Sequence, residues 1–205
     1  MAIEQNYYKA KEYVWERLNK ELDHRLYYHN INHTRKDVLP AAEQLAAKEG
    51  IVGDKLYLLL TGALFHDIGY IEQYENNEPI AARIASEVLH GFGYTTGQIE
   101  IVTSIILSTR MPQKPKTLLE EIMCDADLDS LGREEFHDLG MKLRREYIAF
   151  NNNIPENDWI HQQLLFLENH SYFTYAAREL RNEGKRKNIE NIKKIIELDA
   201  ASQSE

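Results

Sequence analysis

The sequence has 205 residues, of which 43% are hydrophobic and 28% are charged, and this ordinary composition excludes a disordered or low-complexity chain. Its 33 acidic residues outnumber its 24 basic residues, and the formal charge of -9 argues against binding to a nucleic-acid polymer. The longest apolar stretch, around Leu56 to Phe65, is too short to span a bilayer, so we expect no membrane association.

Cysteine usage and the first residues indicate the compartment. The single cysteine, Cys124, cannot form an internal disulfide bond. The first residues include Glu4 and Lys9 where a secretory leader would have a basic flank followed by an apolar block. We therefore expect a cytoplasmic protein in a reducing environment.

Apolar residues recur at helical spacing from the beginning of the chain. The first stripe runs from Ile3 to Leu22 and predicts one long helix. A second pattern covers about 31–48, where Pro40 should kink the helix or mark a restart. Asp54 is expected to be the N-cap of a third helix, which should stop near Gly69.

The helical pattern continues through the second half of the chain. Pro79 lies in the first turn of a fourth helix, which Gly91 and Gly93 should end. Thr95 or Thr96 can cap the next helix. The remaining predicted helices are one capped by Thr117 and running through Met123, and others at about 133–150, 156–175 and 187–198.

These elements predict the fold class. We find no run of strand patterns separated by hairpin turns, no linker and no repeat at a fixed period. The prediction is an all-α, single-domain helical bundle of roughly eight to ten helices over residues 1–199. The motif-bearing core covers about 26–131, and residues 200–205 are expected to be a disordered tail.

The pair His66-Asp67 stands at the end of an apolar helix, in the run LFHDIGY. A buried helix end is a costly place for two ionisable side chains unless each is hydrogen-bonded, paired or bound to a cation. A second copy, His137-Asp138 in FHDLG, lies on a strongly amphipathic, polar segment. We interpret that copy as a solvated face.

Two further groups could bind a cation. In YYHNINHT, His29 and His33 lie on one face if the segment is helical, and this spacing can offer two imidazoles to a metal. The alternative is that one of them caps or hydrogen-bonds a helix end. Downstream, three alternating carboxylates repel one another, so at least one needs a cation or an arginine. They are Asp125, Asp127 and Asp129.

The alternating carboxylates resemble the opening of a calcium-binding EF-hand loop, which can be tested by position. Counting from Asp125, the sixth residue is Ser130 where the loop requires glycine. The twelfth is Phe136 where the loop has glutamate. An EF-hand is therefore excluded.

A histidine, a His-Asp pair and a later aspartate in one helical chain resemble the HD superfamily of metal-dependent phosphohydrolases. The neighbouring Asn77-Glu78, followed by an alanine-rich helix, supports the resemblance. It implies that four side chains bind one divalent cation: His33, His66, Asp67 and Asp127. Asp127 is preferred to Asp125 because the family aspartate follows an alanine, as Asp127 follows Ala126.

Departures from the family pattern narrow the expectation. Dinuclear members have further histidines where this chain has Asn77 and either Ser108 or Thr109. A second metal would lack imidazole ligands, which favours a mononuclear site over a di-iron oxygenase. The lysine that often follows the His-Asp motif is Tyr70 here, so a phosphate contact changes from a cation to a hydroxyl. The alarmone-hydrolase signature is also absent.

The resemblance also implies roles in hydrolysis. Two imidazoles and two carboxylates suit one divalent ion, Mn, Fe, Co, Ni, Zn or Mg, which would activate a water molecule. Asp67 would orient that water, and His29 would protonate the leaving oxygen unless it serves as a structural hydrogen bond. Glu78 is a further candidate for positioning water, with compensation of a helix dipole as the alternative. Arg110 and Tyr70 are the candidates for binding the substrate phosphate.

The sequence thus predicts a metal-dependent phosphohydrolase that cleaves a phosphoester of a small molecule, a nucleotide or related compound. The expected partner is this phosphorylated substrate, and a homodimer is left open. The alternative is a non-catalytic metal- or nucleotide-binding regulatory domain.

Overall fold

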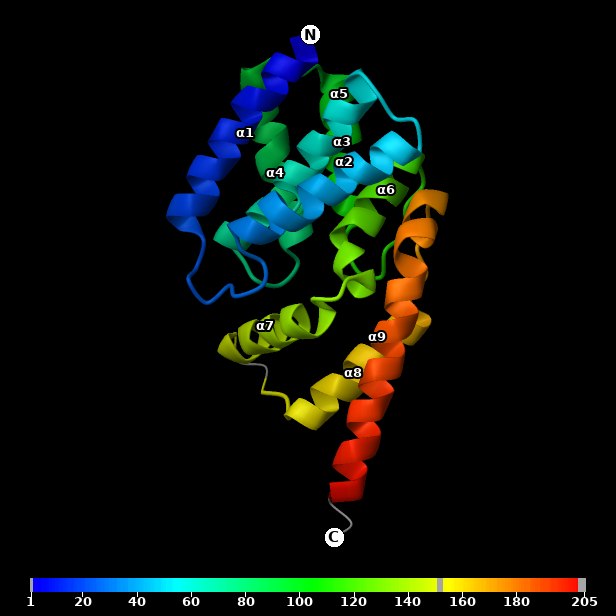
Figure 1. The fold of residues 1–205 in the computed structure, drawn as a ribbon. Helices are drawn as coiled ribbons and strands as arrows, with labels where there is room; N and C mark the ends of the chain where they lie inside the picture. Colours follow the sequence, from blue (N-terminus) through cyan, green and yellow to red (C-terminus); the bar gives the residue numbers. More distant parts are fainter. Residues whose placement is uncertain (1, 151–152, 203–205) are drawn as a thin grey trace.

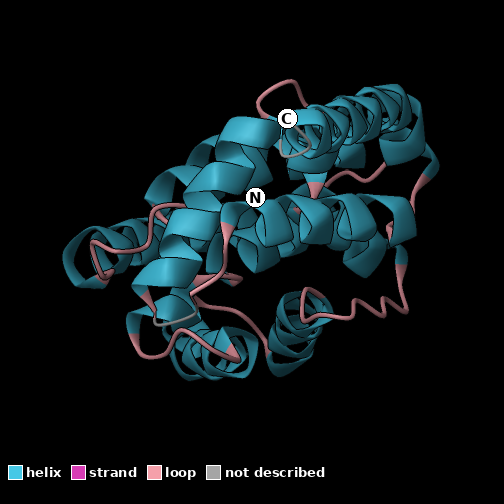
Figure 2. Cartoon of the chain, turned by 90° about the horizontal axis from the view of Figure 1, so that it is seen from below, coloured by secondary structure: helices cyan, strands magenta, loops and turns pink. Residues whose placement is uncertain are grey.

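The computed structural model describes residues 2–150 and 153–202, and every regular element in them is helical. Figure 2 shows helices joined by loops without a strand in this part of the chain. The described residues form nine α-helices, which confirms the all-α prediction. No helix among them combines the length and the apolar character needed to cross a membrane.

The elements follow one another with short connections. The α-helices are α1 (Ala2–Glu21), α2 (Leu39–Lys48), α3 (Asp54–Phe65), α4 (Asn77–Leu89), α5 (Thr96–Ser108), α6 (Leu118–Asp127), α7 (Phe136–Ala149), α8 (Glu156–Asn169) and α9 (Tyr175–Ser202). One π-helical turn, η1 (His33–Val38), precedes α2. Three short 3-10 turns complete the set, η2 (Ile68–Ile71), η3 (His90–Phe92) and η4 (Asp129–Gly132).

Helix α3 lies at the centre of the core. All its residues from Leu58 to Phe65 are buried, because the run LLLTGALF has no polar face to turn toward water. It contacts α1, α2, α5 and α6, which surround it in Figure 1. Gly62 allows the close approach of α5, since a Cβ there would overlap the side chain of Ile105. This packing holds the end of α3, where His66 and Asp67 follow.

The helix predicted over 31–48 consists of two parts. In the π-helical turn η1, the backbone N–H of Leu39 donates to the carbonyl of Thr34, five residues earlier. Helix α2 then begins, with Pro40 in its first turn. The predicted restart at Pro40 is confirmed, because proline fits a first turn, where its missing N–H has no partner to lose. Single π-helical turns are frequent at functional sites, and this one includes His33.

Two predicted caps are confirmed, whereas several helix ends differ from the predictions. Thr95 caps α5 in a capping box with Gln98, and Thr117 caps α6. Helix α6 continues beyond the predicted Met123 to Asp127, so Asp125 and Asp127 belong to the helix itself. Helix α7 covers Phe136–Ala149, within the predicted 133–150. The predicted N-cap at Asp54 is wrong, because Gly53 is the N-cap and Asp54 is already the first residue of α3. The helix ends at Phe65, before the predicted stop at Gly69, and the tight turn η2 follows.

The prediction of separate helices at 156–175 and 187–198 is wrong at their junction. Helix α8 ends at Asn169, and α9 already begins at Tyr175. Thr174 accepts a hydrogen bond from the N–H of Ala177 through Oγ1 at 3.1 Å, as an N-cap residue does. The described part of the expected tail, 200–202, continues α9, and 203–205 lie outside the described residues.

Helices α7, α8 and α9 lie to one side of the bundle formed by α1 to α6 (Figure 1). Helix α9 contacts α8 along its length and also packs against η4, just beyond Asp127. This contact is a close approach of two backbones, since a Cβ at Gly184 would overlap the carbonyl of Gly132. The side-chain amide of Asn188 adds hydrogen bonds to the carbonyls of Leu131 and Arg133, at 3.0 and 2.8 Å.

Replacing Gly184 by alanine should therefore separate α9 from η4. We expect Gly184→Ala to lower the free energy of unfolding by about 1–3 kcal/mol, the usual effect of an overpacked contact. Gly97→Ala is the matched control, because a Cβ there meets nothing within 4 Å, and it should raise stability by about 0.4–1 kcal/mol. Urea denaturation measures both changes, and a Gly184→Ala protein as stable as the parent would contradict this packing.

Candidate metal centre

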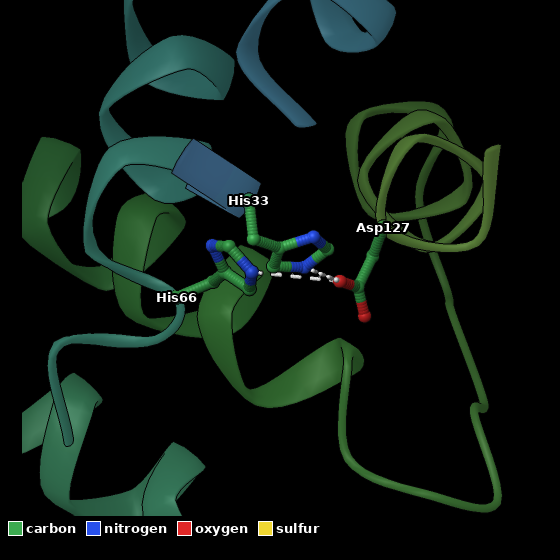
Figure 3. Close-up of side chains that lie close together, drawn as sticks. All are labelled: His33, His66 and Asp127. Atoms are coloured by element: carbon green, nitrogen blue, oxygen red, sulfur yellow. Dashed lines mark hydrogen bonds and ion pairs between the residues drawn. The ribbon is translucent and has the colours of Figure 1, made fainter. Parts of the chain in front are cut away.

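Three segments that are distant in the sequence bring four ionisable side chains together. His33 comes from η1, His66 and Asp67 follow α3, and Asp127 ends α6. The Nε2 atom of His33 lies 3.3 Å from Asp127 Oδ1 and 3.7 Å from Asp67 Oδ2. The Nε2 atom of His66 lies 3.4 Å from Asp127 Oδ1 and 3.1 Å from Asp67 Oδ2. Figure 3 shows the two imidazoles turned toward the carboxylate of Asp127.

These separations suit a shared metal ion. Ligand bonds of about 2.1 Å place neighbouring donor atoms about 3.0–3.4 Å apart in octahedral or tetrahedral geometry. One ligand atom from each of His33, His66 and Asp127 lies within 4.8 Å of the others. The structure therefore brings together all four residues that the sequence resemblance implied as ligands.

Two buried atoms in the cluster lie 3.1 Å apart, and neither forms a hydrogen bond of acceptable geometry among the described residues. They are His66 Nε2 and Asp67 Oδ2. The other ring nitrogen of His66, Nδ1, lies 2.8 Å from the carbonyl of Ala63 and donates to it, which leaves the Nε2 lone pair facing the cluster. An unsatisfied buried polar atom costs about 1–3 kcal/mol, and coordination of a cation would remove this cost. The residues present therefore fit a divalent metal.

The charges in the cluster act strongly on one another. Burial has the largest effect on the pKa of His66 and would lower it, but the carboxylates of Asp67 and Asp127 outweigh burial and raise this pKa well above its usual value. Burial likewise would raise the pKa of Asp127, but hydrogen bonds to His33 and His66 lower it. The two carboxylates thus favour positive charge at the centre, whether it comes from protons or from a metal ion.

A fifth ionisable residue, Glu146, supports His29 from outside the cluster. Its carboxylate is fully buried and accepts hydrogen bonds from the backbone N–H groups of Tyr28 and His29, at 2.8 and 3.0 Å. It also contacts His29 Nδ1, and the His29 ring stacks on Tyr70 with 4.5 Å between centroids. The structural hydrogen bond considered for His29 is therefore present, and the ring also lines the cavity beside the cluster.

Sequence reasoning missed Glu146, although a signal was available. Glu146 shares the helical phase of Phe136, Gly140 and Leu143, which form the inward stripe of α7. A carboxylate on an apolar stripe needs a buried partner. Burial, the largest effect, would lower the pKa of His29, but the bond to Glu146 and the charge of Asp67 raise it overall.

The cluster opens onto a cavity of about 460 Å³. Asp67 and Asp127 line it, and so do Tyr70 and Glu78, two residues that the sequence proposed for substrate and water. The structure does not bring Arg110 into this cavity. Its side chain is exposed and donates a hydrogen bond to Asn76 Oδ1 at 3.1 Å.

The positions of the histidines in dinuclear relatives have other chemistry here. Asn77 and Thr109 line the cavity, and both are buried. The hydroxyl of Thr109 donates to the carbonyl of Ile106 at 2.8 Å, and that of Ser108 donates to Ile105 at 2.7 Å. The protons of both hydroxyls are therefore used in hydrogen bonds to the backbone of their own helix. Asn77 offers only an amide oxygen, which has no hydrogen-bond partner in the described structure.

The three alternating carboxylates have separate partners. Asp125 accepts the backbone N–H groups of Phe173 and Thr174, both at 2.8 Å, and so holds the connection between α8 and α9. Asp129 forms a two-pronged ion pair with Arg181, at 2.6 and 3.0 Å. The expectation that at least one would meet an arginine is confirmed, and Asp127 alone faces the cluster.

The second His-Asp pair behaves as the sequence predicted. His137 and Asp138 begin α7, and both are exposed. Burial at the end of a helix, and not the dipeptide itself, distinguishes His66-Asp67.

Comparison with known proteins agrees with this geometry. A family model described as "HD domain" matches residues 31–130, which include all four clustered residues. A protein of Clostridium beijerinckii, described only as uncharacterized, is 33% identical over 110 residues, which are 52% of this chain and 68% of the relative. The chain belongs to the HD domain family. HD domains bind divalent metals and belong to a superfamily of metal-dependent phosphohydrolases. No solved structure matches this HD domain.

Removing one imidazole should abolish metal binding to the HD domain. At a Mn²⁺ concentration 100 times the Kd, binding stabilises the parent by about 2.7 kcal/mol, or about 5–10 °C in Tm. We expect His66→Ala to lose this shift. His137→Ala, in the exposed copy of the motif, should retain it. Thermal unfolding with and without Mn²⁺ measures both, and equal shifts in the two variants would contradict the assignment.

Removing the Glu146 carboxylate should loosen His29. We expect Glu146→Ala to cost about 2–4 kcal/mol of stability, since two backbone N–H groups and an imidazole lose their acceptor. Glu146→Gln keeps one acceptor and should cost less. Glu134→Ala, on the exposed surface near the start of α7, is the control and should leave stability unchanged. Chemical denaturation gives the three values, and the same cost for Glu146→Ala and Glu134→Ala would exclude the proposed support.

Proposed function

We propose that this HD domain hydrolyses a phosphoester of a small molecule with one divalent ion held by His33, His66, Asp67 and Asp127. The observation that carries the proposal is the position of two buried atoms that lack a hydrogen bond among the described residues, His66 Nε2 and Asp67 Oδ2, beside a cavity. The volume of this cavity, about 460 Å³, is in the range of small-molecule sites. A nucleotide or related compound is the substrate class that the sequence resemblance implied.

The donor set supports a single metal. The places of the extra histidines in dinuclear relatives hold Asn77 and Thr109, and the Thr109 hydroxyl is already hydrogen-bonded to a carbonyl. An amide oxygen and a hydroxyl are weaker ligands for iron than two imidazoles. A di-iron oxygenase is therefore disfavoured.

The carboxylates of Asp67 and Glu78 would orient the attacking water and accept its proton. A divalent ion at this centre supplies Lewis acidity and makes a water molecule more acidic. Asp67 lines the cavity as well as the cluster, so its carboxylate can orient the attacking water. Glu78 lines the same cavity, and its Oε2 is buried without a hydrogen-bond partner in the described residues. Either carboxylate can take the proton that the water releases.

His29 would complete the reaction at the leaving group. The water oxygen forms a bond to phosphorus as the bond between phosphorus and the leaving oxygen breaks. The leaving oxygen then takes a proton from His29, whose Nδ1 is occupied by Glu146 and whose Nε2 remains for the substrate. Tyr70 stacks on this ring and can donate its hydroxyl to a phosphate oxygen. Arg110 could reach a phosphate only after leaving Asn76, and its role stays a prediction.

The decisive experiment combines metal analysis with a substrate panel. We expect one metal per chain and Mn²⁺-dependent hydrolysis of at least one phosphomonoester or phosphodiester. Asp67→Ala should reduce the rate at least 100-fold, since it removes both a ligand and the water-orienting group. Asp138→Ala, the matched change in the exposed copy, should leave the rate unchanged.

Three outcomes separate the competing functions. One metal with turnover supports the proposal. One metal without turnover on any phosphoester would favour the non-catalytic regulatory domain. Two irons per chain would favour the oxygenase.

A further inference from the structure

The cavity beside the metal centre has a second wall that the proposed chemistry does not use. This wall comes from α7, α8 and the segment around η4, which lie to one side of the six-helix bundle in Figure 1. Most of the side chains that form it are apolar, and its polar members are Ser130, Gln162 and Gln163. The apolar members are Leu128, Leu131, Phe136, Leu139, Leu143, Trp159 and Phe166.

The lining has no fixed positive charge. Among the described residues around the cavity none is lysine or arginine, whereas Asp67, Glu78 and Asp127 are acidic. One divalent ion offsets two of these carboxylates, which leaves little positive charge for a second or third phosphate. Beyond the ion, a polyphosphate would meet His29 and Tyr70 as donors but no lysine or arginine of the described lining, and it would lie beside a further carboxylate.

Three arginines close in sequence to lining residues bind elsewhere. Arg110, between the lining residues Thr109 and Met111, is exposed and donates to Asn76 Oδ1 at 3.1 Å. Arg133 pairs with Asp37 at 2.7 Å and with Glu135 at 3.1 Å. Arg144 donates to Glu156 and to the carbonyl of Ile154, at 3.3 and 3.1 Å. Turning any of these toward the cavity would break the contacts that hold it on the surface.

The apolar wall contains one buried donor without a partner. Trp159 lines the cavity with 8% of its surface exposed, and its Nε1–H has no hydrogen-bond partner in the described structure. A buried indole N–H normally finds an acceptor. The side-chain amides of Gln162 and Gln163 also line this part of the cavity. An uncharged oxygen on a mainly apolar ligand would match this arrangement.

We propose that the substrate carries a single phosphate on an uncharged, mainly apolar ring or chain, and that this body lies between α7 and α8. This inference rests on the proposed phosphohydrolase function, and it replaces the nucleotide that the resemblance implied by a more apolar phosphomonoester. The phosphate faces the metal centre, and the apolar body covers Leu143, Phe136 and Trp159. Nucleoside di- and triphosphates are poor ligands for this cavity.

Binding of stable analogues to the Mn²⁺-loaded protein tests the substrate class without turnover. Isothermal titration compares naphthylmethylphosphonate, methylphosphonate and the methylene analogue of adenosine diphosphate. We expect the naphthyl ligand to bind at least tenfold more tightly than either of the others. Tighter binding of the diphosphate analogue would overturn the inference. Tighter binding of adenosine-5′-phosphonate, a nucleoside monophosphate analogue, would overturn the apolar body.

A charge placed in the apolar wall locates the ligand. Leu143→Lys should weaken binding of the naphthyl ligand at least tenfold and should strengthen binding of the diphosphate analogue. Ile148→Lys is the control, because Ile148 lies on the same helix, is exposed and is not among the residues that line the cavity. Equal naphthyl affinity in both variants would place the ligand elsewhere and overturn the proposal. If Leu143→Lys does not fold, Phe166→Lys, at a more exposed wall position, serves the same comparison.

Failure of this inference can be distinguished from failure of the proposed function. A protein that binds no Mn²⁺, or that cleaves no phosphoester on the panel, refutes the proposed function. A protein that binds Mn²⁺, turns over phosphoesters and still prefers the diphosphate analogue refutes only the substrate class.

Discussion

Two carboxylates and two imidazoles meet at one buried point of the helical core, where each charge must be compensated by its neighbours. Charges removed from water are costly unless each is compensated at short range. Here the compensation is mutual, with separations of 3.1 to 3.7 Å between imidazole nitrogens and carboxylate oxygens. The arrangement exists because the apolar helix α3 must be enclosed, and enclosing it also buries the residues that follow it.

The same rule explains how the C-terminal helices are attached. Three buried carboxylates outside the cluster have partners on distant segments. Asp125 holds the start of α9, Asp129 binds Arg181, and Glu146 holds the turn before His33. These contacts keep α7 and α9 close to the metal centre, although direct helix packing between α7 and the main bundle is sparse. The cavity lies beside the cluster, between the main bundle and the segments η4, α7 and α8.

Local patterns predicted most of the fold. Helical periodicity, Thr95 and Thr117 as caps, and Pro40 as a restart are features of neighbouring residues, and the structure confirms them. The junction at 170–174 was missed because the start of α9 depends partly on Asp125. This carboxylate accepts hydrogen bonds from two backbone N–H groups that lie 48 and 49 residues later in the chain. Periodicity within one segment contains no information about such a partner.

The candidate site likewise contains residues that sequence motifs predicted and residues that only the folded chain brings together. The four clustered residues could be proposed because the resemblance covers motifs that are short and ordered along the chain. Glu146, and the apolar wall from α7 and α8, come from a different part of the sequence, and only the folded chain shows that they face the motifs. The arginine proposed for phosphate, Arg110, was chosen by sequence proximity, which does not determine where a long side chain points.

The tether between Glu146 and the turn at Tyr28 and His29 has a consequence for modularity. The family match ends at residue 130, yet the residue that orients His29 comes after it, and His29 itself lies before the match begins. Grafting 31–130 onto another scaffold would transfer the four clustered residues without His29, Glu146 or most of the apolar wall. In this chain, the four clustered residues and most of the apolar wall are therefore encoded in separate stretches of the sequence.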